Sequence, residues 1–130
     1  ETMRDLKIES LIDDRLGKVF LDSTNEERFQ NQTLRPILKF QNDLFILVMK
    51  NYITKHKTGF YSFTTEKKLD FFEYSIKKDI KFRSFLKGLI IGLFQTSEFD
   101  LYIQNSSALN KRMMQLLIER YKSQVQLFEL

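Results

Sequence analysis

Hydrophobic side chains recur along this chain at the three- and four-residue spacing of an α-helix, and strand-like alternation does not recur. The segment 3–20 illustrates the helical pattern. Its apolar residues fall on one stripe, formed by Leu6, Leu11, Ile12 and Leu16. The pattern predicts a first helix in this segment, ending near Gly17.

Capping residues indicate where the next helices begin. Ser23 precedes Glu26 by three residues, the spacing at which each side chain can satisfy an exposed amide of the other. A short helix is expected from there to Gln32. Thr33 is the next expected N-cap, with Pro36 in the first turn, where a missing N–H costs little. The signals therefore predict two separate helices that meet at Thr33.

The apolar run "LFILVM", residues 44–49, lies inside the second of these helices. A helix that is apolar on every side must be surrounded by other helices or by lipid. Six residues cannot cross a bilayer, which needs about 20. We therefore predict a long central helix, from Leu34 to Lys55, around which the rest of the domain packs.

The second half of the chain continues with helical segments between polar breaks. Gly59 can take the left-handed C-cap conformation that ends the central helix, and Thr64 or Thr65 can cap the helix that follows. Further helices are expected over residues 65–78 and 80–94, and Asp79 is the expected cap of the second. A short helix that ends at residue 104 and a long helix that begins at about residue 106 should follow. Helices joined by short connections favour an all-α bundle of six or seven helices.

Composition agrees with one folded domain over residues 1–130. The chain is 42% hydrophobic and has one proline and four glycines, unlike disordered or low-complexity chains. It contains no cysteine, which excludes thiolate metal sites and cysteine nucleophiles. Residues 1–10 are charged and lack the apolar core of a signal peptide. We expect a cytoplasmic protein with no membrane association.

Positive charge is concentrated in the middle of the chain. Residues 35–95 hold twelve bases and five acids. Their densest part is a candidate basic patch formed by Lys77, Lys78, Lys81, Arg83 and Lys87. Such a patch attracts anions, including nucleic acid, but it is also typical of a solvated helix surface.

The segment "NSSALNKR" offers a second candidate anion site. It comprises Asn105, Ser106, Ser107, Asn110 and Lys111 at the start of the last predicted helix. A helix N-terminus presents unpaired N–H groups and the positive end of the helix dipole. The same residue types also serve as ordinary helix caps, so both interpretations stay open.

Two glycines four residues apart, Gly88 and Gly92, interrupt the apolar run "GLIIGLF". Small residues at this spacing let two helices approach closely. The run is too short for a membrane span, and charged or polar residues flank it. We predict that both glycines face another helix at close range, within the domain or across a dimer.

Motifs for catalysis and metal binding are missing from the sequence. Glu66, Asp70 and Glu73 share a helical face, but no Glu-x-x-His motif accompanies them, and His56 is the only histidine. No nucleophile elbow, phosphate-binding loop or dinucleotide fingerprint occurs. An enzyme is not favoured, and no cofactor is expected. The leading hypothesis is a helical module for protein interaction or self-association, with a homodimer as one form. Anion or nucleic-acid binding through the basic patch is the alternative.

Three segments carry a resemblance to a known family: "FQNQTLRPILKFQNDL", "DIKFRSFLKGLIIG" and "IQNSSALNKRMM". They resemble an uncharacterised family of short helical proteins typical of the Bacteroidetes, and the likeness spans most of residues 22–128. Some members are labelled glyoxalase, which implies a βαβββ metal-binding fold with histidine and glutamate ligands. This chain has one histidine and a helical pattern throughout, so no catalytic residue is transferred to it. A glyoxalase-type enzyme remains a further alternative.

Overall fold

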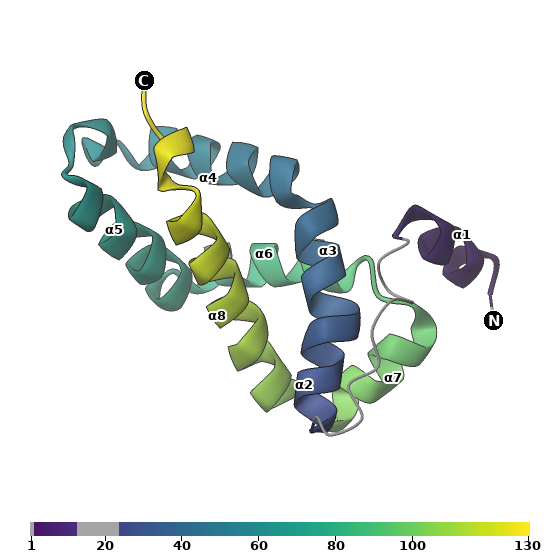
Figure 1. The fold of residues 1–130 in the computed structure, drawn as a ribbon. Helices are drawn as coiled ribbons and strands as arrows, with labels where there is room; N and C mark the ends of the chain where they lie inside the picture. Colours follow the sequence, from purple (N-terminus) through teal and green to yellow (C-terminus); the bar gives the residue numbers. More distant parts are fainter. Residues whose placement is uncertain (1, 13–23) are drawn as a thin grey trace.

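The computed structural model describes residues 2–12 and 24–130, and this part of the chain forms an all-α helical bundle without β-strands (Figure 1). The α-helices are α1 (Met3–Leu11), α2 (Asn25–Phe29), α3 (Arg35–Phe40), α4 (Asn42–His56), α5 (Thr65–Lys78), α6 (Ile80–Ile91), α7 (Thr96–Gln104) and α8 (Ser106–Ser123). A π-helical turn, η2 (Gln30–Leu34), and two 3-10 turns, η3 (Phe60–Ser62) and η4 (Val125–Leu127), complete the described elements. The predicted fold class is confirmed.

Helix α8 packs against α5, α6, α7 and η2, and Figure 1 shows it between α5 and the α2–α3 segment. Its inward positions Leu109, Met113, Leu117 and Tyr121 are at most 3% exposed. These positions are four residues apart, which places them on one stripe facing the core. The last predicted helix is therefore confirmed, together with its buried face.

The prediction of one long helix from Leu34 to Lys55 is wrong, because the helix is interrupted at Gln41. Figure 1 shows the bend between α3 and α4. Helix α3 ends directly before this residue and α4 begins directly after it. The side-chain amide of Gln41 donates to the carbonyl oxygen of Leu89 at 3.0 Å, and the side-chain amide of Asn42 donates to the side-chain oxygen of Gln124 at 2.8 Å. Hydrogen bonds to distant helices thus hold the break, and local helical periodicity does not reveal them.

The N-cap predicted at Thr33 is also wrong, because α2 continues through η2 into α3. Pro36 has no N–H, and its ring crowds the carbonyl group one turn earlier. The wider π-helical turn that precedes it accommodates this defect without ending the helix. The Thr33 side chain has another role, since its hydroxyl donates to the carboxylate of Glu98 on α7.

Side-chain caps set the starts of α2, α5 and α6. Thr64 and Asp79 each accept a hydrogen bond from an N–H in the first turn of the helix that follows, as predicted. Thr24 caps α2 in the same way, whereas Ser23 of the predicted capping box lies outside the described residues. Gly59 adopts the predicted left-handed conformation, with φ of 76°, but it does not cap α4. The C-cap of α4 is Lys57, which is itself left-handed with φ of 46°.

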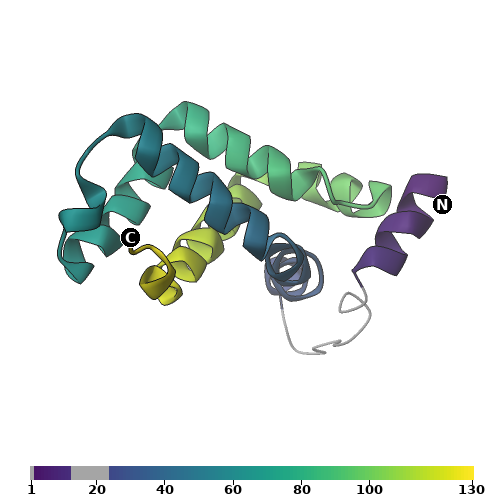
Figure 2. The same ribbon diagram turned by 90° about the horizontal axis from the view of Figure 1, so that it is seen from above.

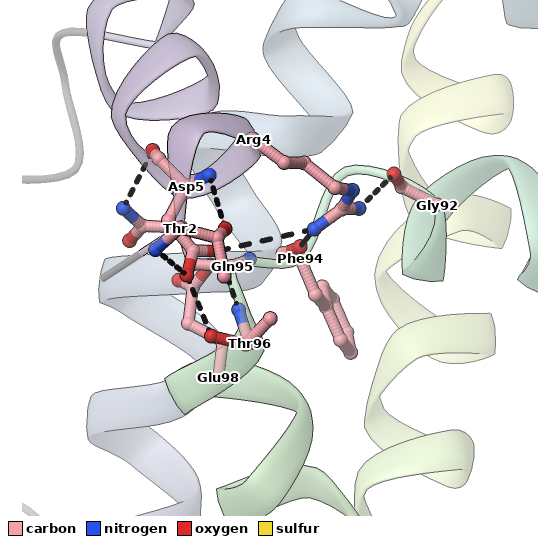
Figure 3. Close-up of polar contacts among 8 residues, drawn as sticks. All are labelled: Thr2, Arg4, Asp5, Gly92, Phe94, Gln95, Thr96 and Glu98. Carbon is pink, nitrogen blue, oxygen red and sulfur yellow. Dashed lines mark hydrogen bonds and ion pairs between the residues drawn. The ribbon is translucent and has the colours of Figure 1, made fainter.

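Helix α1 lies at one end of the bundle, beside the turn that joins α6 to α7 (Figure 2). Figure 3 shows the two residues that attach it. Arg4 donates to the carbonyl oxygens of Gly92 at 2.7 Å and Phe94 at 2.6 Å, near the C-terminus of α6 where carbonyl groups lack helical partners. Asp5 is buried and accepts hydrogen bonds from the hydroxyl and the N–H of Thr96, at 2.6 and 2.7 Å. These bonds hold the pKa of the Asp5 carboxyl well below its usual range.

The apolar stripe predicted for the first helix is only partly right. Ile8 and Ile12 are buried, but Leu6 and Leu11 are 50% and 58% exposed. The carboxylate that anchors the helix precedes Ile8 by about one turn, so the same face carries the anchor and the buried isoleucines. Leu16 lies outside the described residues.

Candidate anion-binding groove

The two candidate anion sets meet in one groove between α5, α6 and α8. This groove has a volume of about 360 Å³. Its cationic lining residues are Lys77 at the end of α5, Arg83 and Lys87 on α6, and Lys111 on α8. No acidic residue is among the described residues that line it. Four positive charges from three helices therefore converge on one hollow.

Neutral donors on α8 complete the polar rim. Ser107 and Asn110 line the groove beside Lys111. The Asn110 side-chain oxygen accepts a hydrogen bond from the hydroxyl of Tyr102, which leaves its amide nitrogen as a donor. The rim can thus surround an anion with ammonium, guanidinium, amide and hydroxyl groups.

Apolar side chains lie beneath the polar rim. Ile76 from α5 and Ile118 from α8 are 0% and 1% exposed, and Met114 from α8 is 7% exposed. These three side chains are almost fully buried, so they offer a ligand little apolar surface.

The cations differ in how firmly the fold holds them. Arg83 donates to the carbonyl oxygen of Lys77 at 2.9 Å, which ties its guanidinium to the end of α5. The Lys77 ammonium lies 3.6 Å from Glu73, which also pairs with Lys122 at 3.3 Å. Both lysines lower the pKa of the Glu73 carboxyl, and Lys122 has the larger effect. Glu73 thus offsets part of the charge of Lys77.

The other two lysines carry the groove's uncompensated charge. Neither Lys87 nor Lys111 forms an ion pair with any residue in the described ranges 2–12 and 24–130. Lys87 is half-buried and Lys111 is exposed. An incoming anion would therefore not have to displace an internal carboxylate from either ammonium group.

The predicted basic patch is divided by the structure. Lys78 and Lys81 are exposed and do not line the groove. Lys77 and Lys81 do not share one helical face, because α5 ends before Asp79 and α6 begins after it. Lys87 follows Arg83 by four residues on the regular helix α6, and both side chains line the groove as their spacing indicates.

The second predicted set is divided as well. Ser107, Asn110 and Lys111 line the groove, but Asn105 and Ser106 do not. Asn105 is the N-cap residue of α8, yet its side chain makes no capping bond and donates to Glu26 at 2.8 Å. It lines a separate hollow formed by residues of α2, α7 and α8.

The close helix contact predicted for Gly88 and Gly92 is not formed within the domain. Both glycines are exposed, and a methyl group at Gly88 would have no neighbour within 4 Å. A methyl group at Gly92 would meet the carbonyl oxygen of Gly88, in its own helix, at 3.0 Å. The inward stripe of α6 is instead formed by Phe82, Leu86 and Ile90, four residues apart. The glycines lie two residues from this stripe, which is the opposite side of the helix.

His56 ends α4 and belongs to a structural cluster. Its ring stacks on Tyr52 with 3.9 Å between centroids, and its Nε2 atom lies 3.9 Å from the carboxylate of Asp79. The Tyr52 hydroxyl donates to the same carboxylate at 2.8 Å. The Phe82 N–H and this hydroxyl lower the pKa of Asp79. The cluster ties the end of α4 to the start of α6.

In the described part of the chain, no group of three or more His, Cys, Asp or Glu side chains could hold a metal ion. No described helix combines the length and the apolar character needed to cross a bilayer.

Sequence reasoning missed that the two candidate sets form one site. A signal was present on α8, where Ser107, Lys111, Met114 and Ile118 follow the spacing i, i+4, i+7 and i+11 of one helical face. That face joins polar and apolar lining residues. The approach of α5 and α6 to it depends on tertiary packing.

No protein family, curated protein or solved structure matches the chain. The function is therefore inferred from the geometry of the groove.

Proposed function

We propose that the protein is a non-enzymatic module that binds a small anionic ligand in the groove between α5, α6 and α8. The observation that carries the proposal is the convergence of Lys77, Arg83, Lys87 and Lys111 on one hollow without an acidic lining residue among the described positions. Charges of one sign in a concave site raise the local concentration of oppositely charged ligands. The groove therefore favours anions by its charge and limits their size by its volume.

The ligand class follows from the lining. Ammonium groups bind phosphate oxygens as point charges, and the Arg83 guanidinium can donate to two oxygens at once. Three cations remain in excess after Glu73 is set against Lys77, which favours a ligand with at least two negative charges. Ile76, Met114 and Ile118 are almost fully buried, so the groove does not require an apolar group on the anion. Pyrophosphate and small phosphate monoesters have the required charge.

Calorimetric titration at low ionic strength tests this proposal, with pyrophosphate and phenyl phosphate as probes. Lys87→Gln and Lys111→Gln each remove one charge from the groove. Lys78→Gln and Lys81→Gln are matched controls, because they remove the same charge from the same basic region outside the groove. We expect each groove variant to weaken binding about tenfold, which corresponds to about 1.4 kcal/mol, and the controls to change it little.

Two results would reject the groove. One is no measurable binding of either probe to the unmodified protein at low salt. The other is equal loss of affinity in all four variants, because a diffuse surface field would then suffice. An oligonucleotide that binds more tightly than pyrophosphate, and that depends on Lys78 and Lys81, would favour the nucleic-acid alternative.

Self-association is a second candidate function, supported by the outer face of α7. Phe99 and Ile103 lie one turn apart and are 43% and 55% exposed, while Glu98 and Tyr102 face inward. Exposed apolar groups at this spacing can pack against the same face of a second copy. Sedimentation velocity over a range of concentrations should then show a dimer that Phe99→Ser dissociates. A monomer at every concentration would reject this candidate.

A further inference from the structure

A second hollow, of about 410 Å³, lies between α3 and the C-terminal half of α8. Two arginines line it, Arg35 from α3 and Arg120 from α8. Leu116 and Ser123 also line it, whereas Ile118 lines the groove described above. At 100° per residue these positions fall on different faces of α8, so the two sites are separate.

The guanidinium of Arg120 is held by a pair of neutral amides. It donates to the side-chain oxygen of Asn42 at 3.1 Å. Asn42 and Gln124 donate to each other, both at 2.8 Å, so each amide fixes the orientation of the other. Among the described residues, Arg120 uses one donor in these contacts, and a guanidinium carries five N–H groups. The side chain is thus positioned while most of its donors stay available.

Arg35 is positioned in a similar way from the opposite element. Its Nε atom donates to the side-chain oxygen of Asn31 at 3.1 Å, one turn earlier. No other hydrogen bond of this guanidinium occurs within the described ranges. Its two terminal nitrogen atoms, which form the fork used for oxyanions, therefore remain free.

Neither arginine is neutralised by a carboxylate in the part of the chain that the structure describes. No ion pair within 4.0 Å joins Arg35 or Arg120 to an acidic residue there. Glu119 lines the same hollow, but its carboxylate accepts from the Gln115 amide at 3.2 Å. Partial burial and the charge of Arg35 lower the pKa of the Arg120 guanidinium. The two like charges thus oppose each other without an internal counter-ion.

We infer that this hollow is a second anion site, in which Arg35 and Arg120 bind one oxyanion group, a carboxylate or a phosphate, between their guanidinium forks. Planar guanidinium groups match the spacing of oxygens in both anions. Glu119 limits the site to a single anionic group, because a larger polyanion would approach its carboxylate. Ser123 and Gln124 also line the hollow, but the Ser123 hydroxyl and the Gln124 side-chain amide both donate to the carbonyl oxygen of Arg120, at 2.8 and 3.1 Å. The donors available to the anion are therefore those of the two arginines.

The test is an NMR titration with inorganic phosphate and, separately, with succinate. It is made in the Lys87→Gln, Lys111→Gln double variant, so that binding in the groove does not mask the second site. We expect the Nε–H signals of Arg35 and Arg120 to shift with saturation in the presence of at least one of the two probes. The relative affinities of phosphate and succinate then identify the preferred oxyanion.

Three variants make the test specific. Arg35→Gln should weaken binding about tenfold, equivalent to about 1.4 kcal/mol for one charge-assisted contact. Arg120→Lys keeps the charge but loses the fork, so it should weaken binding as well and still preserve the fold. Arg112→Gln is the matched control, because Arg112 lies on the same helix and donates to the Gln30 amide but does not line the hollow.

The inference is overturned if neither probe shifts the two arginine signals at tens of millimolar. It is also overturned if Arg112→Gln weakens binding as much as Arg35→Gln does. The two sites lie on different faces of α8, so a negative result for this hollow would not contradict binding in the groove between α5, α6 and α8.

Discussion

Lys87 on α6 and Lys111 on α8 line the same groove from two different helices, although 24 positions separate them in the chain. Neither ammonium group is paired with a carboxylate among the residues that the structure describes. Like charges that share a hollow repel each other, and an anion bound between them offsets this repulsion because it attracts both ammonium groups. The relationship between these lysines is the basis of the proposed binding function.

If both lysines contact one ligand, their contributions to affinity should be coupled. In a double-mutant cycle with Lys87→Gln, Lys111→Gln and pyrophosphate, the double variant should lose less binding energy than the sum of the single losses. Residues that share a partner commonly show coupling of about 0.5 kcal/mol or more. Calorimetry measures it directly. Strictly additive losses would indicate that the two lysines do not act on the same anion.

Replacement of Gly88 by alanine should stabilise the protein. The residue lies in the interior of α6, and an added methyl group would meet no atom within 4 Å. Alanine is better than glycine in a helix by about 1 kcal/mol, so the free energy of unfolding should rise by about 0.5–1 kcal/mol. Chemical denaturation measures this change.

The control for that experiment is Gly59→Ala, which should destabilise the protein. Gly59 has φ of 76°, where a Cβ atom costs about 1–2 kcal/mol. A loss of stability in Gly88→Ala would instead support the helix contact that the sequence predicted.

Removal of the Tyr121 hydroxyl should weaken the core. Tyr121 is 1% exposed, and its hydroxyl donates to the carbonyl oxygen of Phe45 at 2.6 Å. Burial raises the pKa of this phenol, so the hydroxyl stays protonated and able to donate. Tyr121→Phe should cost about 1 kcal/mol, the usual net value of one buried hydrogen bond. Tyr74→Phe, at a residue 69% exposed, should leave the melting temperature unchanged. Equal effects at the two positions would contradict this role.

The attachment of α1 should depend on pH through Asp5. Hydrogen bonds from Thr96 lower the folded-state pKa of this carboxyl. A lowered pKa stabilises the fold above the unfolded value of about 4, and the stabilisation is lost as pH falls through the folded value. Asp5→Asn should therefore lower the melting temperature at pH 7, and the difference from the unmodified protein should shrink in acid.

The exposed Asp100 provides the control, since Asp100→Asn removes a carboxylate on α7 that is not part of this attachment. Its melting temperature should follow the unmodified protein at every pH. A difference between Asp5→Asn and the unmodified protein that stays constant down to strong acid would show that the carboxylate charge does not hold α1.

Helix ends set by local caps could be predicted from the sequence. Thr64 and Asp79 lie next to the helices they cap, and the predicted bounds of α5 agree with the structure. The break at Gln41 could not be predicted in this way. It depends on hydrogen bonds to Leu89 and Gln124, which lie 48 and 82 positions from their respective partners in the chain. Local patterns carry no information about such contacts.

The charged residues of the groove could be identified from the sequence, but their convergence on one site could not. The shared face of Arg83 and Lys87 follows from their four-residue spacing within α6, which is a local property. Their meeting with Lys111 depends on how α6 packs against α8. The glycines of α6 were misinterpreted, although the stripe of Leu86 and Ile90 already indicated which face turns inward.

The most direct test of the groove is an NMR titration of the isotope-labelled protein with pyrophosphate at low salt. Binding in the groove should give saturable shifts at Lys87, Ser107, Asn110 and Lys111, which line it together. These shifts should weaken as ionic strength rises. Shifts at Lys78 and Lys81 that equal those of the groove and do not saturate, or no shifts at all, would contradict it.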